Sequence, residues 1–177
     1  MGNSRRQAIE EAFKTNKEII IWIEPEKYTF IKEIKKCVES IINHEADMVI
    51  PKRKSLATYP LAQQYVEPFA NLMWKDVTGL DLDIWSGFKV FKRTLSKYFL
   101  DYNGEYGDKW ESIVIPVIDA IANGERVVGV EIDYVHPIEQ TKSEEGNFDF
   151  HRKRIEQLNN FLKIEEHWKK CMDNKKK

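Results

Sequence analysis

The chain has 177 residues, of which 42% are hydrophobic and 32% are charged, so it can bury one core and is not disordered over most of its length. Its 28 Lys and Arg residues nearly balance 29 Asp and Glu residues, and the net charge of −1 argues against a nucleic-acid partner. No run of residues approaches the roughly 18 apolar positions of a membrane span. We therefore expect one domain over residues 1–177, with no membrane span.

Helix and strand patterns alternate along the first part of the chain. Residues 5–16 and 30–42 place apolar side chains on one helical face. Each is followed by a short run rich in β-branched residues, over 18–23 and 47–50, of the kind that is buried on both faces of a parallel sheet. This alternation predicts βαβ units.

The remaining elements are less regular. We expect helices over 61–77, 95–100, 110–122 and 149–170, a strand or tight turn over 84–91, a strand over 126–135, and a polar loop over 141–147. Together the patterns predict an α/β fold of three layers with a mostly parallel central sheet, Rossmann-like in type, and a disordered tail over 170–177. Because the chain opens on a helix, we expect the fold to lack its first nucleotide-binding strands.

The two cysteines, Cys37 and Cys171, stand alone in the sequence and form no C-x-x-C pair. With no apolar leader at the start of the chain, they indicate reduced thiols in a cytoplasmic protein. His44, His151 and His167 lie on or near polar helix faces and are expected to be ordinary surface residues.

Two acidic residues and one histidine follow expected strands. Glu24 and Glu26 come just after the first strand, where open α/β sheets bind ligands, and paired carboxylates there can hold Mg²⁺ or Mn²⁺. The alternative is an acidic start to the next helix. His136 ends the last strand and could complete a metal site, or could be a hydrogen-bonded structural residue.

Basic residues follow the second strand and begin the final helix. Lys52 and Arg53 come directly after the strand over 47–50 and could hold phosphate oxygens, although a solvated loop explains them as well. Arg152 belongs to a similar basic patch. These residues are therefore the candidate anion-binding groups.

A glycine-containing loop over 104–111 carries three acids ahead of an apolar helix. Glu105, Asp108 or Glu111 could act as a general base toward a hydroxyl acceptor, and Trp110 could stack on a sugar ring. A surface turn with an acidic helix start is the alternative. The chain has no P-loop, no G-x-G-x-x-G and no Ser-His-Asp order.

The order of three segments resembles glycosyltransferases of the GT-A fold, family 2 type. These segments are the glycine-led helix that starts GNSRRQAI, then EIIIWIEPEK, then ADMVIPKR. Further along, the segment DIWSGFKVFKR resembles the acceptor-side strand of that family, and VEIDYVHP resembles the late strand of glucosyl- and mannosyl-phosphoglycerate synthases. The resemblance covers about residues 2–160. Glu replaces Asp at both positions of the acidic motif.

The resemblance implies roles for particular residues. It implies that Glu24, Glu26 and His136 bind the metal, and that Arg53 assists the diphosphate. Gly87 would let the acceptor approach. An acid within 105–111 would then serve as the catalytic group.

The implied activity is metal-dependent transfer of a hexose from a nucleotide-diphosphate sugar to a small hydroxyl acceptor. The alternative is a truncated, non-catalytic module of the same type that binds a sugar phosphate or a partner chain. A metal-dependent nucleotidyl- or phosphoryl-transferring enzyme is a third possibility, because paired acids at a strand end serve those reactions too. A homodimer through the open sheet edge is a further expectation, since exposed edges invite association.

Overall fold

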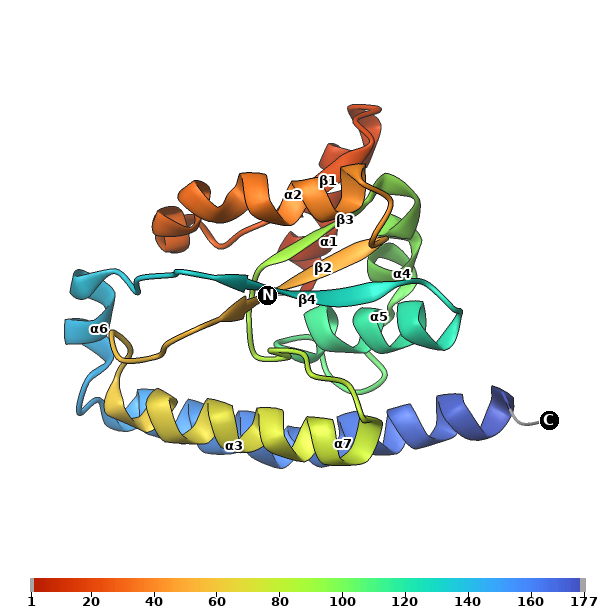
Figure 1. The fold of residues 1–177 in the computed structure, drawn as a ribbon. Coiled ribbons are helices and arrows are strands. Elements are labelled where there is room, and N and C mark those ends of the chain that lie inside the picture. Colours follow the sequence, from red (N-terminus) through yellow and green to blue (C-terminus); the bar gives the residue numbers. More distant parts are fainter. Residues whose placement is uncertain (1, 176–177) are drawn as a thin grey trace.

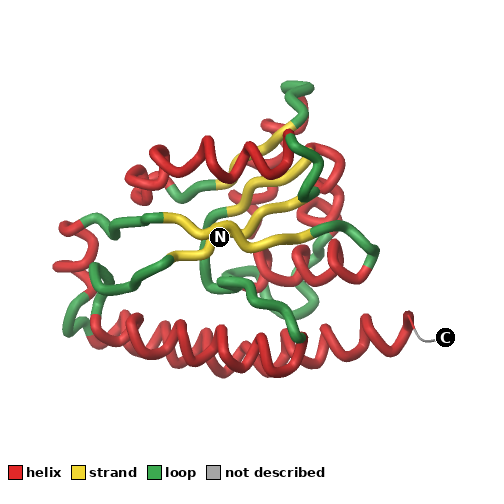
Figure 2. Tube along the Cα trace, viewed as in Figure 1, coloured by secondary structure: helices red, strands yellow, loops and turns green. Residues whose placement is uncertain are grey.

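The structure is a computed structural model that describes residues 2–175, and it is an α/β fold (Figures 1 and 2). The helices are α1 (Gly2–Lys14), α2 (Ile34–Ile42), α3 (Leu61–Thr78), α4 (Ser96–Asp101), α5 (Glu111–Ala122), α6 (Ile138–Glu144) and α7 (Phe148–Lys175), with 3₁₀ turns η1 (Pro25–Glu33) and η2 (Arg93–Leu95). The strands are β1 (Ile19–Trp22), β2 (Met48–Arg53), β3 (Lys89–Lys92) and β4 (Val127–Ile132).

The four strands form one open, mixed sheet in the order β1-β3-β2-β4. Strand β3 is antiparallel to both of its neighbours, whereas β2 and β4 are parallel. The expectation of a mostly parallel sheet was therefore wrong at the level of strand pairs. Because β1, β2 and β4 still run in one direction, their carboxyl ends meet at the same edge of the sheet as the amino end of β3.

Strand β2 is buried on both faces of the sheet, where its successive side chains point to opposite sides. Met48 and Ile50 belong to one core cluster, and Val49 belongs to the other. Figure 1 shows α2 on one face of the sheet and α5 on the other. Helix α7 packs against both α3 and α5, so the longest helix closes the α5 side of the molecule.

Several element boundaries differ from the expectations. The strand expected over 84–91 is confined to β3, because residues before Lys89 reach the core from a turn: Ile84, Trp85 and Phe88 are all buried there. The polar loop expected over 141–147 is largely α6, a helix with no buried residue and therefore no apolar periodicity to reveal it. Helix α7 continues through Lys175, so residues 170–175 are helical, and residues 176–177 lie outside the described residues.

Within residues 2–175, none of the helices combines the length and the apolar character needed to cross a bilayer.

Candidate functional site

A cavity of about 560 Å³ opens at the sheet edge where β1, β2 and β4 end. Its acidic lining residues are Glu24, Glu26, Glu67, Glu111, Glu144 and Glu156, and its basic ones are Arg5, Lys27, Arg53, Lys109, Lys153 and Arg154. Aromatic side chains complete the wall: Trp22, Tyr59, Trp85, Phe88 and Trp110. The cavity therefore combines an apolar surface with charges of both signs, as small-molecule sites do.

Two tryptophans of the aromatic wall, Trp85 and Trp110, stack on each other. The rings of Trp85 and Trp110 are stacked, with centroids 4.5 Å apart and planes inclined by 29°. Trp85 belongs to the turn before β3, and Trp110 immediately precedes α5, so the fold brings distant segments together to make the pair. The tight packing fixes both rings at the cavity surface.

Several buried polar atoms of the cavity wall have no hydrogen-bond partner within residues 2–175. They are the indole nitrogens of Trp22, Trp85 and Trp110, Gln63 Oε1, Glu144 Oε2 and Arg154 Nε. Leaving a buried polar atom unpaired costs about 1–3 kcal/mol. These atoms belong to side chains that line the cavity, and a polar occupant that reached them would satisfy both donors and acceptors.

The predicted metal ligands Glu24, Glu26 and His136 lie in or beside this cavity, but their ligand atoms do not converge on one position. Glu24 and Glu26 both line it. Glu24 Oε1 lies 3.8 Å from Arg5 Nη2, and a Cβ atom added to Gly87 would approach Glu24 Oε2 to 3.3 Å. Gly87 thus permits the close approach of this carboxylate, and it lines the cavity itself.

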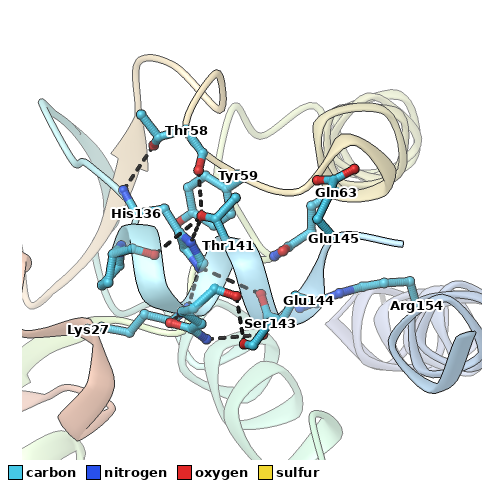
Figure 3. A network of polar contacts seen from close by, with 12 residues as sticks. Lys27, Thr58, Tyr59, Gln63, His136, Thr141, Ser143, Glu144, Glu145 and Arg154 are labelled. Atoms are coloured by element: carbon cyan, nitrogen blue, oxygen red, sulfur yellow. Dashed lines mark hydrogen bonds and ion pairs between the residues drawn. The ribbon is translucent and has the colours of Figure 1, made fainter. Parts of the chain in front are cut away.

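His136 is buried beside the cavity and engaged at both ring nitrogens (Figure 3). Its Nδ1 lies 2.8 Å from Thr141 Oγ1, which donates to the carbonyl oxygen of Thr58, so Nδ1 carries the proton. Its Nε2 then accepts from Lys27 Nζ at 2.8 Å. Burial, reinforced by the Lys27 charge, lowers the pKa of His136 to about 3, so the ring is neutral near pH 7.

A divalent cation could bind beside His136 Nε2 only if the Lys27 side chain moved away. The ammonium group of Lys27 stands where His136 Nε2 and Gln140 Oε1 converge, at 2.8 and 2.9 Å. Carboxylate, imidazole and amide oxygen are acceptable ligands for Mg²⁺ or Mn²⁺, and the buried Glu144 Oε2 without a hydrogen-bond partner lies 3.9 Å from His136 Nε2. His136, Gln140 and Glu144 therefore lie around the position of Lys27 Nζ, and of the predicted metal ligands His136 is the one in this group.

Arg53 lines the cavity, but carboxylates of the chain already engage it. Its Nε and Nη2 donate to the two Asp83 oxygens at 2.6 and 2.8 Å, and Nη1 lies 2.8 Å from Glu67 Oε2. The guanidinium also lies over the Tyr59 ring, 5.1 Å from its centroid. This bidentate, buried pairing makes Arg53 part of the folded scaffold, whereas the sequence predicted a diphosphate ligand.

The other two predicted basic residues lie outside the cavity lining. Lys52 is paired with Asp81 at 2.6 Å, and Arg152 with Asp149 at 3.0 Å. The basic patch that contains Arg152 does reach the cavity, through Lys153 and Arg154. Arg152 and Arg154 lie two residues apart on α7 and so do not share a face.

Of the three predicted catalytic acids, the lining includes only Glu111. Glu111 is 3% exposed, accepts from Asn160 Nδ2 at 2.8 Å, and accepts from the Lys109 backbone at 3.2 Å. Asp108 instead holds Arg6, and Glu105 lies on the surface 3.8 Å from Lys170. Trp110, predicted as a stacking residue, lines the cavity beside Glu111.

Sequence reasoning missed three basic groups of this region. Lys27 directly follows the acidic pair, and Arg5 lies in α1 with its Nη1 donating to Ser112 Oγ at 3.0 Å. Lys89 is fully buried and donates to the Ser86 carbonyl oxygen. Burial lowers the pKa of Lys89 to about 7, against the opposing effect of Asp83. The alternation of β3 marks Lys89 as a strand residue but gives no sign of its burial.

Neither a protein-family model nor a curated protein sequence matches this chain.

Proposed function

We propose that this chain is a hexosyltransferase of the GT-A type that binds a nucleotide-diphosphate sugar in the cavity and transfers the hexose to a small hydroxyl acceptor. Under this proposal the four strands are part of a three-layer, Rossmann-like core. The observation that carries it is the composition of the cavity wall: stacked tryptophans, carboxylates and unpaired indole N–H groups together.

A sugar matches this wall chemically. The C–H face of a hexose is apolar and stacks on aromatic rings such as Trp85 and Trp110. Its hydroxyl groups both donate and accept, so they can pair with indole N–H groups and with carboxylates such as Glu24 and Glu111. A purely apolar ligand would leave all these groups unpaired.

The diphosphate of such a donor needs cationic partners, and the cavity supplies them without Arg53. Arg154 lines the cavity, and its buried Nε has no hydrogen-bond partner within residues 2–175. Lys153 and Lys27 line the same cavity. Arg154 also lies 3.3 Å from Glu67, so this basic group is held by the carboxylate that pairs Arg53. We assign the phosphate-facing role to Arg154 and Lys153.

Glu111 is the group we assign to proton transfer. The acceptor hydroxyl oxygen attacks the anomeric carbon, the bond from that carbon to the diphosphate oxygen breaks, and the nucleoside diphosphate leaves with the bonding pair. The hydroxyl proton goes to the Glu111 carboxylate. Asn160 and the Lys109 amide hold that carboxylate in place.

A divalent cation, when bound, would offset the negative charge of the departing diphosphate. His136 would hold it beside Gln140 and Glu144, and Glu24 and Glu26, which line the same cavity, would join only if their side chains moved toward that point. Lys27 would then have to release His136, so Lys27 and the metal compete for one histidine nitrogen.

That competition also favours a second candidate function, a non-catalytic module that binds a sugar phosphate. In such a module Lys27 would remain on His136 and provide the positive charge itself. Binding would then be independent of divalent metal, and no hexose would be transferred. The two candidates differ in a measurable property, the effect of a chelator on affinity.

Calorimetric titration with a panel of nucleotide-diphosphate sugars, with Mn²⁺ or with EDTA, tests the proposal. We expect binding that Mn²⁺ strengthens and that Glu26→Gln weakens at least 10-fold. Glu111→Gln should keep the affinity but lower the transfer rate by about 10²–10⁴-fold, the usual contribution of a general base. Glu105→Gln and Arg152→Gln are matched controls outside the lining and should match wild type. Chelator-independent binding without transfer would instead support the module, and absence of binding would overturn both candidates.

A further inference from the structure

Three side chains of different chemistry meet where α5 packs against α7, and none of them lines the cavity described above. Asp119 comes from α5, and His167 and Cys171 come from α7. Spacing by four residues places His167 and Cys171 on one helix face. Asp119 Oδ1 lies 2.7 Å from His167 Nε2, and Cys171 Sγ lies 3.5 Å from the same nitrogen.

The geometry is that of converging ligands rather than of a proton relay. In a Cys-His-Asp relay, the acid and the thiol contact opposite nitrogens of the ring. Here both face Nε2, and Nδ1 is buried with no hydrogen-bond partner within residues 2–175. An oxygen, a nitrogen and a sulfur therefore point toward one another in the space beside His167 Nε2.

The spacing of these atoms is close to that of a zinc sphere. With ordinary bond lengths, a tetrahedral Zn²⁺ would hold its oxygen, nitrogen and sulfur ligands about 3.4–3.6 Å apart. The sulfur–nitrogen distance is already 3.5 Å. The sulfur–oxygen distance of 4.0 Å and the oxygen–nitrogen distance of 2.7 Å need adjustments of less than 1 Å, which rotation of the Asp119 carboxylate can supply.

The surroundings hold these ligands in place. Helix α7 is anchored next to the cluster by Ile164 and Trp168, which are buried in the core. The Tyr106 ring packs edge-on against His167, with centroids 4.9 Å apart. The His167 side chain is 12% exposed and that of Asp119 is 32% exposed, so the cluster is shielded yet open to an entering ion.

We propose that Asp119, His167 and Cys171 bind one Zn²⁺ ion and leave a fourth position for water. A thiolate and an imidazole together select zinc over the harder cations Mg²⁺ and Ca²⁺. As the ion binds, the Cys171 thiol releases its proton to solvent, and the proton on His167 Nε2, which faces Asp119, is transferred through solvent to Nδ1 so that Nε2 can bind the metal. Because the ligands come from α5 and α7, the ion joins these two helices and stabilises the folded chain. This site is independent of the proposed sugar chemistry.

The test uses the full chain titrated with Zn²⁺ by calorimetry and with Co²⁺ by absorbance. We expect one equivalent of Zn²⁺ per chain and a thiolate-to-cobalt charge-transfer band. Cys171→Ser, His167→Gln and Asp119→Asn should each weaken Zn²⁺ binding by about 100-fold or more, since loss of even an outer-shell partner costs 10–100-fold. Free Zn²⁺ at a hundred times its Kd should raise the Tm of the wild-type chain by roughly 5–10 °C.

Matched controls separate this site from non-specific binding. His151→Gln alters an exposed histidine of the same helix and should bind Zn²⁺ as wild type does. In Cys171→Ser the second cysteine, the buried Cys37, remains, so a cobalt–thiolate band that persists in this variant would overturn the assignment. Unchanged zinc affinity in the three ligand variants, or no stoichiometric binding by the wild-type chain, would overturn it as well.

Discussion

Two polar regions lie at the same sheet edge, namely the ion pairs around Arg53 and the wall of the cavity. They differ in whether their buried polar groups have hydrogen-bond partners within the chain. Around Arg53, the guanidinium and the Asp83 carboxylate pair with each other, and Asn71 donates to Asp83 at 2.9 Å. In the cavity wall, the indole nitrogens of Trp85 and Trp110 have no partner within residues 2–175. A buried group with its partners supplied by the chain belongs to the scaffold. A buried group without one leaves hydrogen-bonding capacity that a ligand can use where the side chain also lines the cavity; Trp74 Nε1 is unpaired as well but lies outside the lining.

This difference separates residues that the sequence presents as alike. Arg53 and Arg154 both line the cavity, but the bidentate Asp83 pairing holds Arg53, whereas Arg154 keeps an unpaired buried Nε. Desolvation opposes the charge of Arg53, but the Asp83 and Glu67 carboxylates outweigh it and raise the pKa of Arg53 well above its usual value. Arg53 is therefore a permanent cation of the scaffold, and its role is structural.

The largest expected effect comes from breaking the scaffold pair. Asp83→Asn leaves part of the buried Arg53 charge uncompensated and should lower the free energy of unfolding by about 3–5 kcal/mol. Asp81→Asn is the matched control, because Asp81 pairs with Lys52 on the surface, and it should cost at most about 1 kcal/mol. Urea denaturation measures both. Equal losses in the two variants would show that Arg53 does not depend on Asp83.

A smaller effect concerns the buried Lys89. Burial lowers its pKa to about 7 in the folded chain, whereas the unfolded value is about 10.4. Between these values the unfolded state binds more protons, so stability should rise with pH by up to about 1.4 kcal/mol per pH unit. The destabilisation caused by burying the Lys89 charge therefore reaches its maximum below pH 7 and disappears above the pKa of the unfolded chain.

Lys89→Met should remove this slope and make the chain more stable at pH 7. Urea denaturation at pH 7, 8 and 9 measures the slope. The control Lys35→Met changes a lysine whose side chain is 86% exposed, and it should retain the wild-type slope. A wild-type slope that survives in Lys89→Met would assign the pH dependence to another group.

Local patterns predicted much of the fold, and tertiary contacts account for the misses. The runs over 18–23 and 47–50 contain strands β1 and β2, and the expected burial on both faces holds for β2. It was wrong for β1, an edge strand whose Ile21 is 37% exposed. The stretch over 84–91 is equally apolar, but part of it fills the core from a turn, and composition does not separate the two cases. The direction of strand β3 could not be predicted either, because the sequence Lys89–Lys92 contains no feature that distinguishes antiparallel from parallel pairing.

The candidate site was predicted in part for similar reasons. One cavity is lined by Glu24, which follows β1, and by Trp110 and Glu111, which lie at the start of α5. The partners of Arg53 come from α3 and from the turn before β3, so spacing along the chain could not show that Arg53 is already paired. His167 looked like an ordinary surface residue because its contact with Asp119 joins two helices distant in sequence.

The smallest change in energy, and the most direct test of the central claim, is at the indole N–H groups themselves. The chain has five tryptophans, so a ¹H–¹⁵N correlation spectrum should resolve their indole signals, assigned by single Trp→Phe variants. Saturation with the nucleotide-diphosphate sugar selected by calorimetry should shift the signals of Trp22, Trp85 and Trp110. Trp74 and Trp168, which pack against each other away from the cavity lining, should not respond. If the signals of Trp74 and Trp168 move as much as the others, or if none moves at saturation, the cavity is not the sugar site.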